Sequence, residues 1–176
     1  NHGVGAEVLE RVQGEARAFF ALPREEKRRV VRDADNPLGY YDTEHTGNVR
    51  DWKDVFDFLV VDGLPVPGPE GVRRINNQWP EHPHELREAC EEYVRAVEKL
   101  AFQLLELIAM SLGLPARRLH GFFEEQSSFV RLNHYPACPV PHLALGVGCH
   151  KDAGALTVLS QDDVGGLEVF TGDRWQ

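Results

Sequence analysis

His150 and Asp152, a histidine and an aspartate one residue apart, are the pair in this sequence whose types and spacing best suit chemistry. On an extended segment, residues i and i+2 point to the same side, with Cα atoms roughly 7 Å apart. An imidazole nitrogen and a carboxylate oxygen placed in this way can both reach one metal ion at about 2.1 Å. The pattern therefore indicates a candidate metal site.

The local sequence leaves two interpretations of this pair open. With 8 histidines and 28 acidic residues in 176, chance alone yields about one His-x-acid match. In favour of a metal role, Gly146 and Gly148 predict a turn just before the pair, and an apolar run follows it. With a second histidine, the pair would complete the facial triad of a non-haem Fe(II) site, which leaves positions for a cosubstrate and O2.

Two helical regions precede this candidate site. Apolar residues at helical spacing predict a helix over residues 4–20, which ends at Leu22-Pro23. A second start is predicted at Pro23, with proline at the first helical position. Gaps of three and four between apolar residues predict one long amphipathic helix from about residue 83 to 112, ended by Gly113.

The strand signals concentrate in the last third. We expect strands over 54–61, 129–135, 155–159 and 167–170, because these runs are rich in β-favouring residues and end at Gly or Pro. The Pro- and Gly-rich stretch 65–71 is expected to be a loop. The chain therefore reads as a helical region followed by the start of an antiparallel β-domain.

Composition excludes several classes of function. The formal net charge of −9 argues against a nucleic-acid partner, because such proteins need a basic face. No apolar run approaches the ~20 residues of a membrane span, so we expect no membrane partner. The three cysteines suggest neither a disulfide framework nor a C-x-x-C zinc pair, so a reducing, cytoplasmic location is expected.

Several segments, taken in chain order, resemble the plant 2-oxoglutarate- and Fe(II)-dependent dioxygenases related to isopenicillin N synthase. Any one of them is a weak signal, whereas the ordered set along the whole chain is specific. The segments are Asn-His-Gly-Val (1–4), Phe-Phe-Ala-Leu-Pro-Arg-Glu-Glu-Lys (19–27), Gly-Tyr (39–40), Asp-Trp-Lys-Asp (51–54), Asn-Gln-Trp-Pro (77–80), Asn-His-Tyr-Pro-Ala-Cys-Pro (133–139), His-Lys-Asp (150–152), Leu-Thr-Val-Leu-Ser-Gln (156–161) and Gly-Gly-Leu-Glu-Val (165–169).

The resemblance implies an α+β fold with a double-stranded β-helix (jelly-roll) core, incomplete in this chain. Residues 1–125 would form the N-terminal, mainly helical region, which includes the long helix. Residues 126–176 would form the first, truncated part of the jelly-roll domain. No nucleic-acid or membrane partner is implied, and the oligomeric state stays open.

The resemblance also assigns roles to four residues. His150 and Asp152 would bind Fe(II), and Asn133 and Tyr135 would line the 2-oxoglutarate site, where a Tyr hydroxyl is a suitable donor to a carboxylate. The implied cofactors are Fe(II), 2-oxoglutarate as cosubstrate and O2, with ascorbate as reductant. The implied reaction is oxidation, by hydroxylation or desaturation, of a small organic plant metabolite, with decarboxylation of 2-oxoglutarate to succinate.

The sequence departs from the family pattern after Asp152. The family's second iron-binding histidine and the Arg-x-Ser pair beyond it are not found before Gln176. We therefore expect a fragment or a truncated product that binds iron weakly and turns over little. Three alternatives stay open: a same-fold oxidase that does not use 2-oxoglutarate, a catalytically inactive relative that acts as a binding protein, and a helical binding domain with an accidental His-x-Asp.

Overall fold

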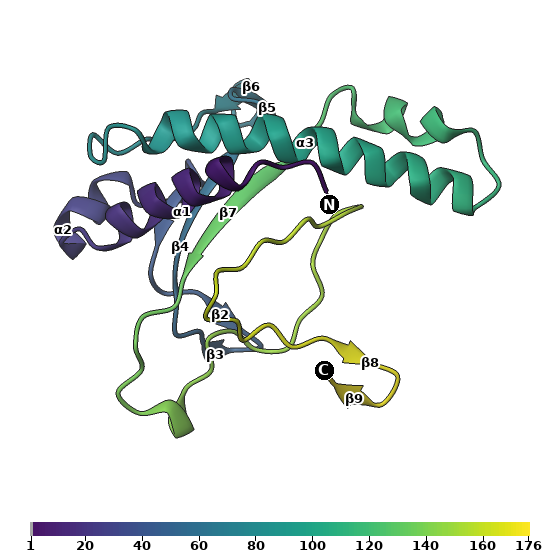
Figure 1. Ribbon diagram of the computed structural model, residues 1–176. Coiled ribbons are helices and arrows are strands. Elements are labelled where there is room, and N and C mark those ends of the chain that lie inside the picture. The colour runs from purple at the N-terminus through teal and green to yellow at the C-terminus, as the bar shows by residue number, and fades with distance from the viewer. Residues whose placement is uncertain (1) are drawn as a thin grey trace.

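A computed structural model describes residues 2–176. A three-stranded antiparallel sheet in the order β1-β4-β7 lies at its centre, formed by Gly39–Tyr41, Asp54–Leu59 and Phe129–His134. Two helices, α1 (Ala6–Phe20) and α3 (Leu86–Ser111), pack on one face of this sheet (Figure 1). The expected α+β class is confirmed.

The helices follow the apolar spacing of the sequence. The 26-residue α3 ends where Gly113 adopts a φ of 72°, a left-handed conformation that suits glycine and stops a helix. Pro23 is the N-cap of the short α2 (Arg24–Lys27) rather than its first helical residue. Two 3-10 turns, η1 (Arg28–Val30) and η2 (Ala116–Phe123), follow α2 and α3 respectively. Within residues 2–176, no helix combines the length and apolar character needed to cross a membrane.

Alternation along β4 gives the sheet two different faces. Phe56 and Phe58 point toward the helices, where the ring of Phe56 lies 5.0 Å from that of Phe19, centroid to centroid. Asp57, between them, points to the opposite face. Burial of these aromatic rings joins α1 and α3 to the sheet, and it leaves the second face for polar residues.

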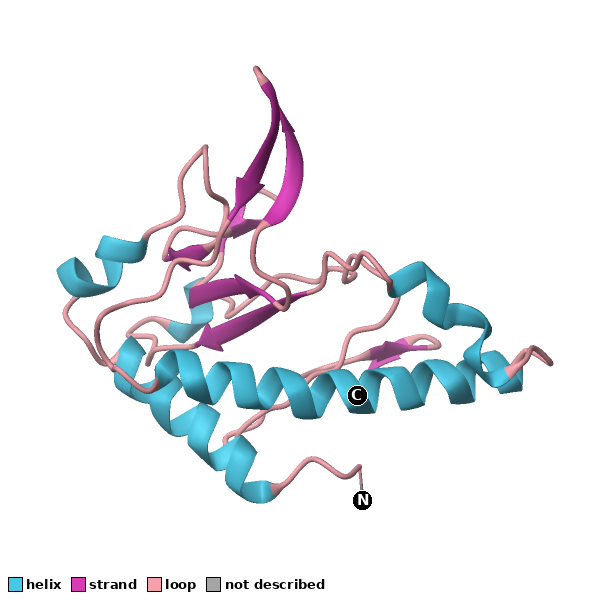
Figure 2. Ribbon diagram, turned by 90° about the horizontal axis from the view of Figure 1, so that it is seen from above, coloured by secondary structure: helices cyan, strands magenta, loops and turns pink. Residues whose placement is uncertain are grey.

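Two hairpins extend from this core. Gly47 and Asn48 both have positive φ, 58° and 66°, which makes a tight turn between β2 (His45–Thr46) and β3 (Val49–Arg50). The second hairpin pairs β5 (Leu64–Gly68) with β6 (Gly71–Ile75) and projects away from the helices (Figure 2).

The prediction of a loop over residues 65–71 is therefore wrong. Pro65 and Pro67 lie in β5, which is one of only two strands in its sheet. A proline lacks an amide N–H, so it is tolerated in such a strand where that position faces away from the partner. The proline-rich composition favoured a loop prediction for residues that form a strand.

After β7 the chain runs mostly without regular structure. A 3-10 turn, η3 (Pro141–Leu143), is followed by one small hairpin, β8 (Phe170–Thr171) with β9 (Arg174–Trp175). The predicted strand over 155–159 does not form within residues 2–176, and the one predicted over 167–170 reaches only Phe170. A strand exists through hydrogen bonds to a neighbour, and no described segment pairs with 155–159.

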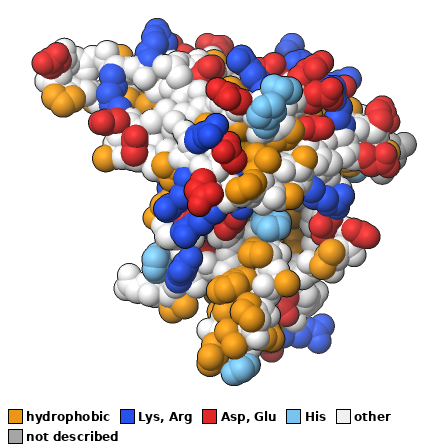
Figure 3. All heavy atoms as spheres, turned by 90° about the vertical axis from the view of Figure 1, so that its left-hand side faces the viewer, with side chains coloured by type: hydrophobic (Ala, Val, Ile, Leu, Met, Phe, Trp, Pro, Cys, Tyr) orange, Lys and Arg blue, Asp and Glu red, His pale blue; other side chains and the backbone are white. Residues whose placement is uncertain are grey.

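Many hydrophobic side chains in and after β7 are consequently exposed. Figure 3 shows hydrophobic side chains gathered in the lower part of the face it presents. The exposed large hydrophobic residues from β7 onward are Phe129, Tyr135, Val140, Leu143, Leu145, Leu159, Val164, Leu167, Val169, Phe170 and Trp175.

Candidate metal centre

His150 and Asp152 lie side by side in the structure. His150 Nε2 is 3.3 Å from Asp152 Oδ1, and about half of each side chain is exposed. Two donor atoms about 2.1 Å from one metal ion, at a right angle to each other, would be about 3.0 Å apart. The pair therefore has close to the spacing of two neighbouring ligands of a single ion.

The other ring nitrogen of His150 is already engaged. Nδ1 lies 2.8 Å from the carbonyl oxygen of Gly148, and a carbonyl only accepts, so Nδ1 carries the proton and donates it. This leaves Nε2 with a lone pair available to a metal ion. Metal-binding histidines commonly have this arrangement, with the second nitrogen held by a backbone carbonyl.

The two candidate ligands at this site have side chains chemically suited to Fe(II). An imidazole and a carboxylate are the donor types of non-haem iron sites. Among residues 2–176, no group of three or more His, Cys, Asp or Glu side chains is placed to hold one ion. The site thus has two candidate ligands, and the metal role of His150 and Asp152 stays a prediction.

Trp52 connects the two segments that carry the candidate residues. Its backbone N–H donates to Leu145 O (2.8 Å), five residues before His150. Its indole Nε1–H donates to Pro136 O (3.0 Å), next to Tyr135. One residue of the Asp-Trp-Lys-Asp segment therefore fixes the loop before the metal pair against the end of β7.

Asn133 and Tyr135, the predicted 2-oxoglutarate residues, differ in their surroundings. Both are exposed, and Asn133 lies on the face of the sheet opposite the helices, since its alternation places it with Arg131. The ring of Tyr135 lies so close to Gly146 that a Cβ atom added to Gly146 would be 2.9 Å from that ring. Partial burial, more than the charges around it, raises the pKa of the Tyr135 hydroxyl, so it is a proton donor at neutral pH.

A charged network lies on the same face, beside Tyr135. Arg131 binds both Asp57 oxygens, at 2.8 and 2.7 Å, and also Glu44, at 2.9 Å. Lys53 Nζ, itself almost fully buried, lies 2.9 Å from Glu44. Burial acts to raise the pKa of Glu44, but Lys53 and Arg131 outweigh it and hold that pKa below its usual value. The motifs marked this region, but the sequence did not predict the network, because its members come from three separate segments, around Glu44, Lys53 to Asp57, and Arg131.

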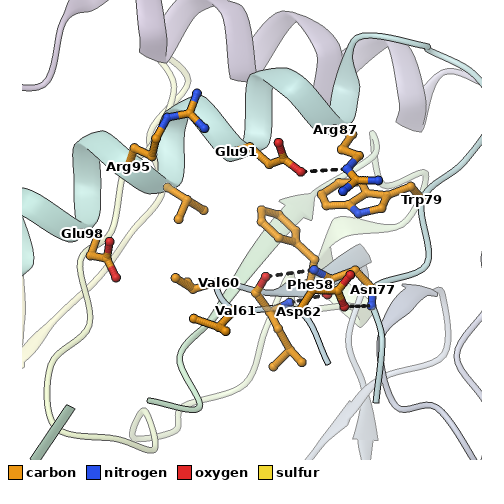
Figure 4. A pocket seen from close by; sticks show the side chains of 12 residues that line it. Phe58, Val60, Val61, Asp62, Asn77, Trp79, Arg87, Glu91, Arg95 and Glu98 are labelled. Atoms are coloured by element: carbon orange, nitrogen blue, oxygen red, sulfur yellow. Dashed lines mark hydrogen bonds and ion pairs between the residues drawn. The ribbon is translucent and has the colours of Figure 1, made fainter. Parts of the chain in front are cut away.

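One cavity lies elsewhere, between the end of β4 and α3. It measures about 250 Å³, with Phe58 and Trp79 among its apolar walls and the ion pair of Arg87 with Glu91 at one side (Figure 4). None of the four predicted site residues lines it. It therefore offers no support for the predicted chemistry.

Two family models match this chain. The model described as the N-terminal region of non-haem dioxygenases in morphine synthesis matches residues 1–82. The model of the 2OG-Fe(II) oxygenase superfamily matches residues 126–176. The second match contains all four predicted site residues.

Similar curated proteins are plant enzymes. Jasmonate-induced oxygenase 4 of Arabidopsis thaliana is 39% identical over 180 residues, which cover 99% of this chain and 49% of that protein. Gibberellin 20 oxidase 1 of Oryza sativa subsp. japonica is 38% identical over 184 residues, 100% of this chain and 49% of that protein. Leucoanthocyanidin dioxygenase of Malus domestica is 34% identical over 182 residues, 99% and 49% respectively. The chain thus spans about half the length of the curated relatives it matches.

Solved structures show the same fold. A crystal structure of JOX2 in complex with 2OG, Fe and JA is 26% identical and superposes with a TM-score of 0.71, covering 88% of this chain and 44% of that one. A 2OG-Fe(II) oxygenase family protein from Caulobacter crescentus gives a TM-score of 0.63 at 22% identity, covering 77% and 45%. This confirms the expected fold class, present here in part. Because the two family models together match more than half of the chain, in the order that the motifs predicted, the chain belongs to the 2-oxoglutarate- and Fe(II)-dependent oxygenase family.

Proposed function

We propose that this chain forms the Fe(II)-binding half of an oxidoreductase that couples oxidation of a small organic plant metabolite, by hydroxylation or desaturation, to decarboxylation of 2-oxoglutarate. His150 Nε2 and Asp152 Oδ1 supply two iron ligands. The observation that carries this proposal is their 3.3 Å separation, with the other nitrogen of His150 held by Gly148. Iron, when bound, supplies the activation of O2 that no amino-acid side chain provides.

The residues of this chain contribute to this chemistry by positioning the metal ligand and the cosubstrate. Gly148 fixes the ring of His150 in the tautomer that leaves Nε2 available. Tyr135, with its raised pKa, keeps a hydroxyl proton to donate to a carboxylate oxygen of 2-oxoglutarate. Asn133 would contribute its amide on the same face of the sheet. Ascorbate would serve as a reductant.

The remaining parts of the site are proposed to come from outside these 176 residues. The family pattern needs a second histidine and an Arg-x-Ser pair after Asp152, and neither occurs in this sequence. The matched relatives are about twice as long as this chain. Further strands from such a second half would also give residues 155–159 a hydrogen-bonding partner and cover the exposed hydrophobic residues.

The substrate class is proposed from the relatives alone. Their names refer to jasmonate, gibberellin, leucoanthocyanidin and naringenin, all small organic molecules. We infer a small metabolite of this kind, acted on by a cytoplasmic enzyme. The enzyme names also favour catalysis over the alternative of an inactive binding protein.

A direct test asks whether 2-oxoglutarate assists metal binding. Because a 2-oxo acid adds its own donor atoms to the metal, 2-oxoglutarate should tighten anaerobic Fe(II) binding by the chain, which we expect to be weak with two protein ligands. Equilibrium dialysis with and without 2-oxoglutarate measures this gain. Tyr135→Phe should reduce the gain, and Tyr93→Phe, at a buried position in α3, should leave it unchanged. Equal Fe(II) affinity with and without 2-oxoglutarate would favour the alternative of an oxidase that does not use this cosubstrate.

A further inference from the structure

Gly148 links two residues through the two sides of its backbone. Its carbonyl accepts the Nδ1–H of His150 at 2.8 Å. Its own N–H donates to Asp51 Oδ1 at 3.4 Å, across 97 positions of the sequence. A continuous path of two hydrogen bonds therefore joins Asp51 to the imidazole ring of His150.

Asp51 is itself firmly held. Only 3% of the residue is exposed, so it belongs to the interior, unlike the half-exposed His150. Its second oxygen, Oδ2, accepts the Thr46 hydroxyl at 2.8 Å and lies 3.3 Å from Lys53 Nζ. A buried carboxylate with three partners is a rigid reference point, because each contact removes a direction in which it could move.

Close packing reinforces this path at Gly148. A Cβ added to Gly148 would be 3.0 Å from Thr46 Cγ2 and 3.1 Å from Thr46 Cβ. Thr46 is fixed in turn by the tight β2–β3 turn at Gly47 and Asn48. A side chain at residue 148 would therefore force Thr46 or the loop to shift by a few tenths of an ångström.

We propose that Asp51 is a positioning residue for the metal site: through Gly148 it orients His150 so that Nε2 is presented to the metal. This inference deepens the proposed function and rests on it. Asp51 touches neither candidate ligand directly, so its effect reaches the metal only through the backbone of Gly148. Removing a group that hydrogen-bonds a metal-binding histidine changes metal affinity by about 10- to 100-fold. Here that group is the Gly148 carbonyl, which Asp51 holds in place.

The test compares four forms of the chain: wild type, Asp51→Ala, Asp51→Asn and Thr46→Val. Asn keeps an oxygen that can accept the Gly148 N–H. Val keeps the shape of Thr46 and its contact with Gly148 but removes only the hydrogen bond to the other oxygen of Asp51. The first readout is the ¹⁵N spectrum of the His150 ring without metal, at a pH where the ring is neutral. The second is Zn(II) affinity, with Zn(II) as a diamagnetic stand-in for Fe(II).

We expect wild type and Asp51→Asn to keep the Nδ1-protonated ring and similar Zn(II) affinities, and Thr46→Val to fall between them and Asp51→Ala, because it removes one of the three contacts that hold Asp51. Asp51→Ala should mix the two tautomers and lower Zn(II) affinity by about 10- to 100-fold. An unchanged His150 spectrum in Asp51→Ala would overturn the inference, as would an Asp51→Asn variant that behaves like Asp51→Ala.

Hydrogen exchange keeps the inference testable if Asp51→Ala does not fold. In wild type, the Gly148 amide should exchange more slowly than an unstructured glycine amide, and equal rates would overturn the inference. Failure of the proposed function is separate: a wild-type chain that binds no Zn(II) contradicts the metal site, while the His150 spectra still decide the role of Asp51.

Discussion

Arg131 of β7 grips Asp57 of β4 across the sheet with two parallel hydrogen bonds, Nε to Oδ1 at 2.8 Å and Nη2 to Oδ2 at 2.7 Å. These two residues face each other in the strand register and lie on the face opposite the helices. The hydrogen bonds to Asp57, with the nearby carboxylates, raise the pKa of Arg131 further above its already high value. The pair therefore ties the strand that carries Asn133 to the centre of the sheet.

Asp57→Ala should lower the free energy of unfolding by about 3 kcal/mol, because it leaves a partly buried guanidinium without its main partner. The double variant Asp57→Leu/Arg131→Leu should lose less, since it removes both charges together. Urea denaturation of the single and double variants measures this difference. A double variant less stable than Asp57→Ala would show that the pair is not the source of the effect.

Because of the environment of His134, we expect the folded chain to lose stability at mildly acidic pH. Its ring stacks on Phe20 at 5.0 Å, and its Nδ1 is buried without a hydrogen-bond partner among residues 2–176. Burial lowers the pKa of His134, so the folded chain favours the neutral ring. As pH falls below about 6.5, the unfolded chain takes up a proton first, and the free energy of unfolding should decrease.

His134→Phe should flatten this part of the stability profile between pH 7 and about pH 5, because it removes the group whose pKa differs between the two states. His142→Gln, at an exposed position, should leave the profile as in wild type. Thermal melts at a series of pH values provide the comparison. A His134→Phe profile as steep as that of wild type would assign the acid sensitivity to other groups.

Gly148→Ala should weaken metal binding with little change in overall stability. The new methyl group would meet the side chain of Thr46, whose branched Cβ has little freedom to turn away. The loop that carries His150 would therefore shift. We expect Zn(II) affinity to fall by about tenfold.

Gly14→Ala is the matched control for that variant. Gly14 is exposed in α1, where a Cβ would meet nothing within 4 Å, and alanine is the better helix former by roughly 0.5–1 kcal/mol. It should raise the melting temperature slightly and leave Zn(II) affinity unchanged. Equal affinities for Gly148→Ala and wild type would contradict the close packing inferred at Gly148.

Elements with many repeats of one pattern were predictable from sequence. The helix predicted over about 83–112 is α3, because nine apolar positions at helical spacing leave few alternatives. Strands were less predictable, since they depend on partners. Residues 54–59 and 129–134 form strands because they pair with each other, whereas 155–159 has equally suitable residues and no partner among residues 2–176.

The candidate site was likewise predictable only where its signal was local in the sequence. The spacing of His150 and Asp152 was sufficient to predict that the two side chains converge. The Asp-Trp-Lys-Asp segment stood out as a motif, yet nothing local showed that Asp51 reaches Gly148 or that Trp52 reaches Pro136. Such contacts span more than 80 positions and depend on the folded sheet and its hairpin.

The most direct measurement of the central claim is Fe(II) binding under anaerobic conditions by wild type, His150→Ala, Asp152→Ala and the exposed control His142→Ala. The proposed site predicts weak binding by wild type and His142→Ala, further weakened or lost in both ligand variants, because each removes one of two protein donors. Identical Fe(II) affinity in all four chains would contradict the assignment of His150 and Asp152 as iron ligands.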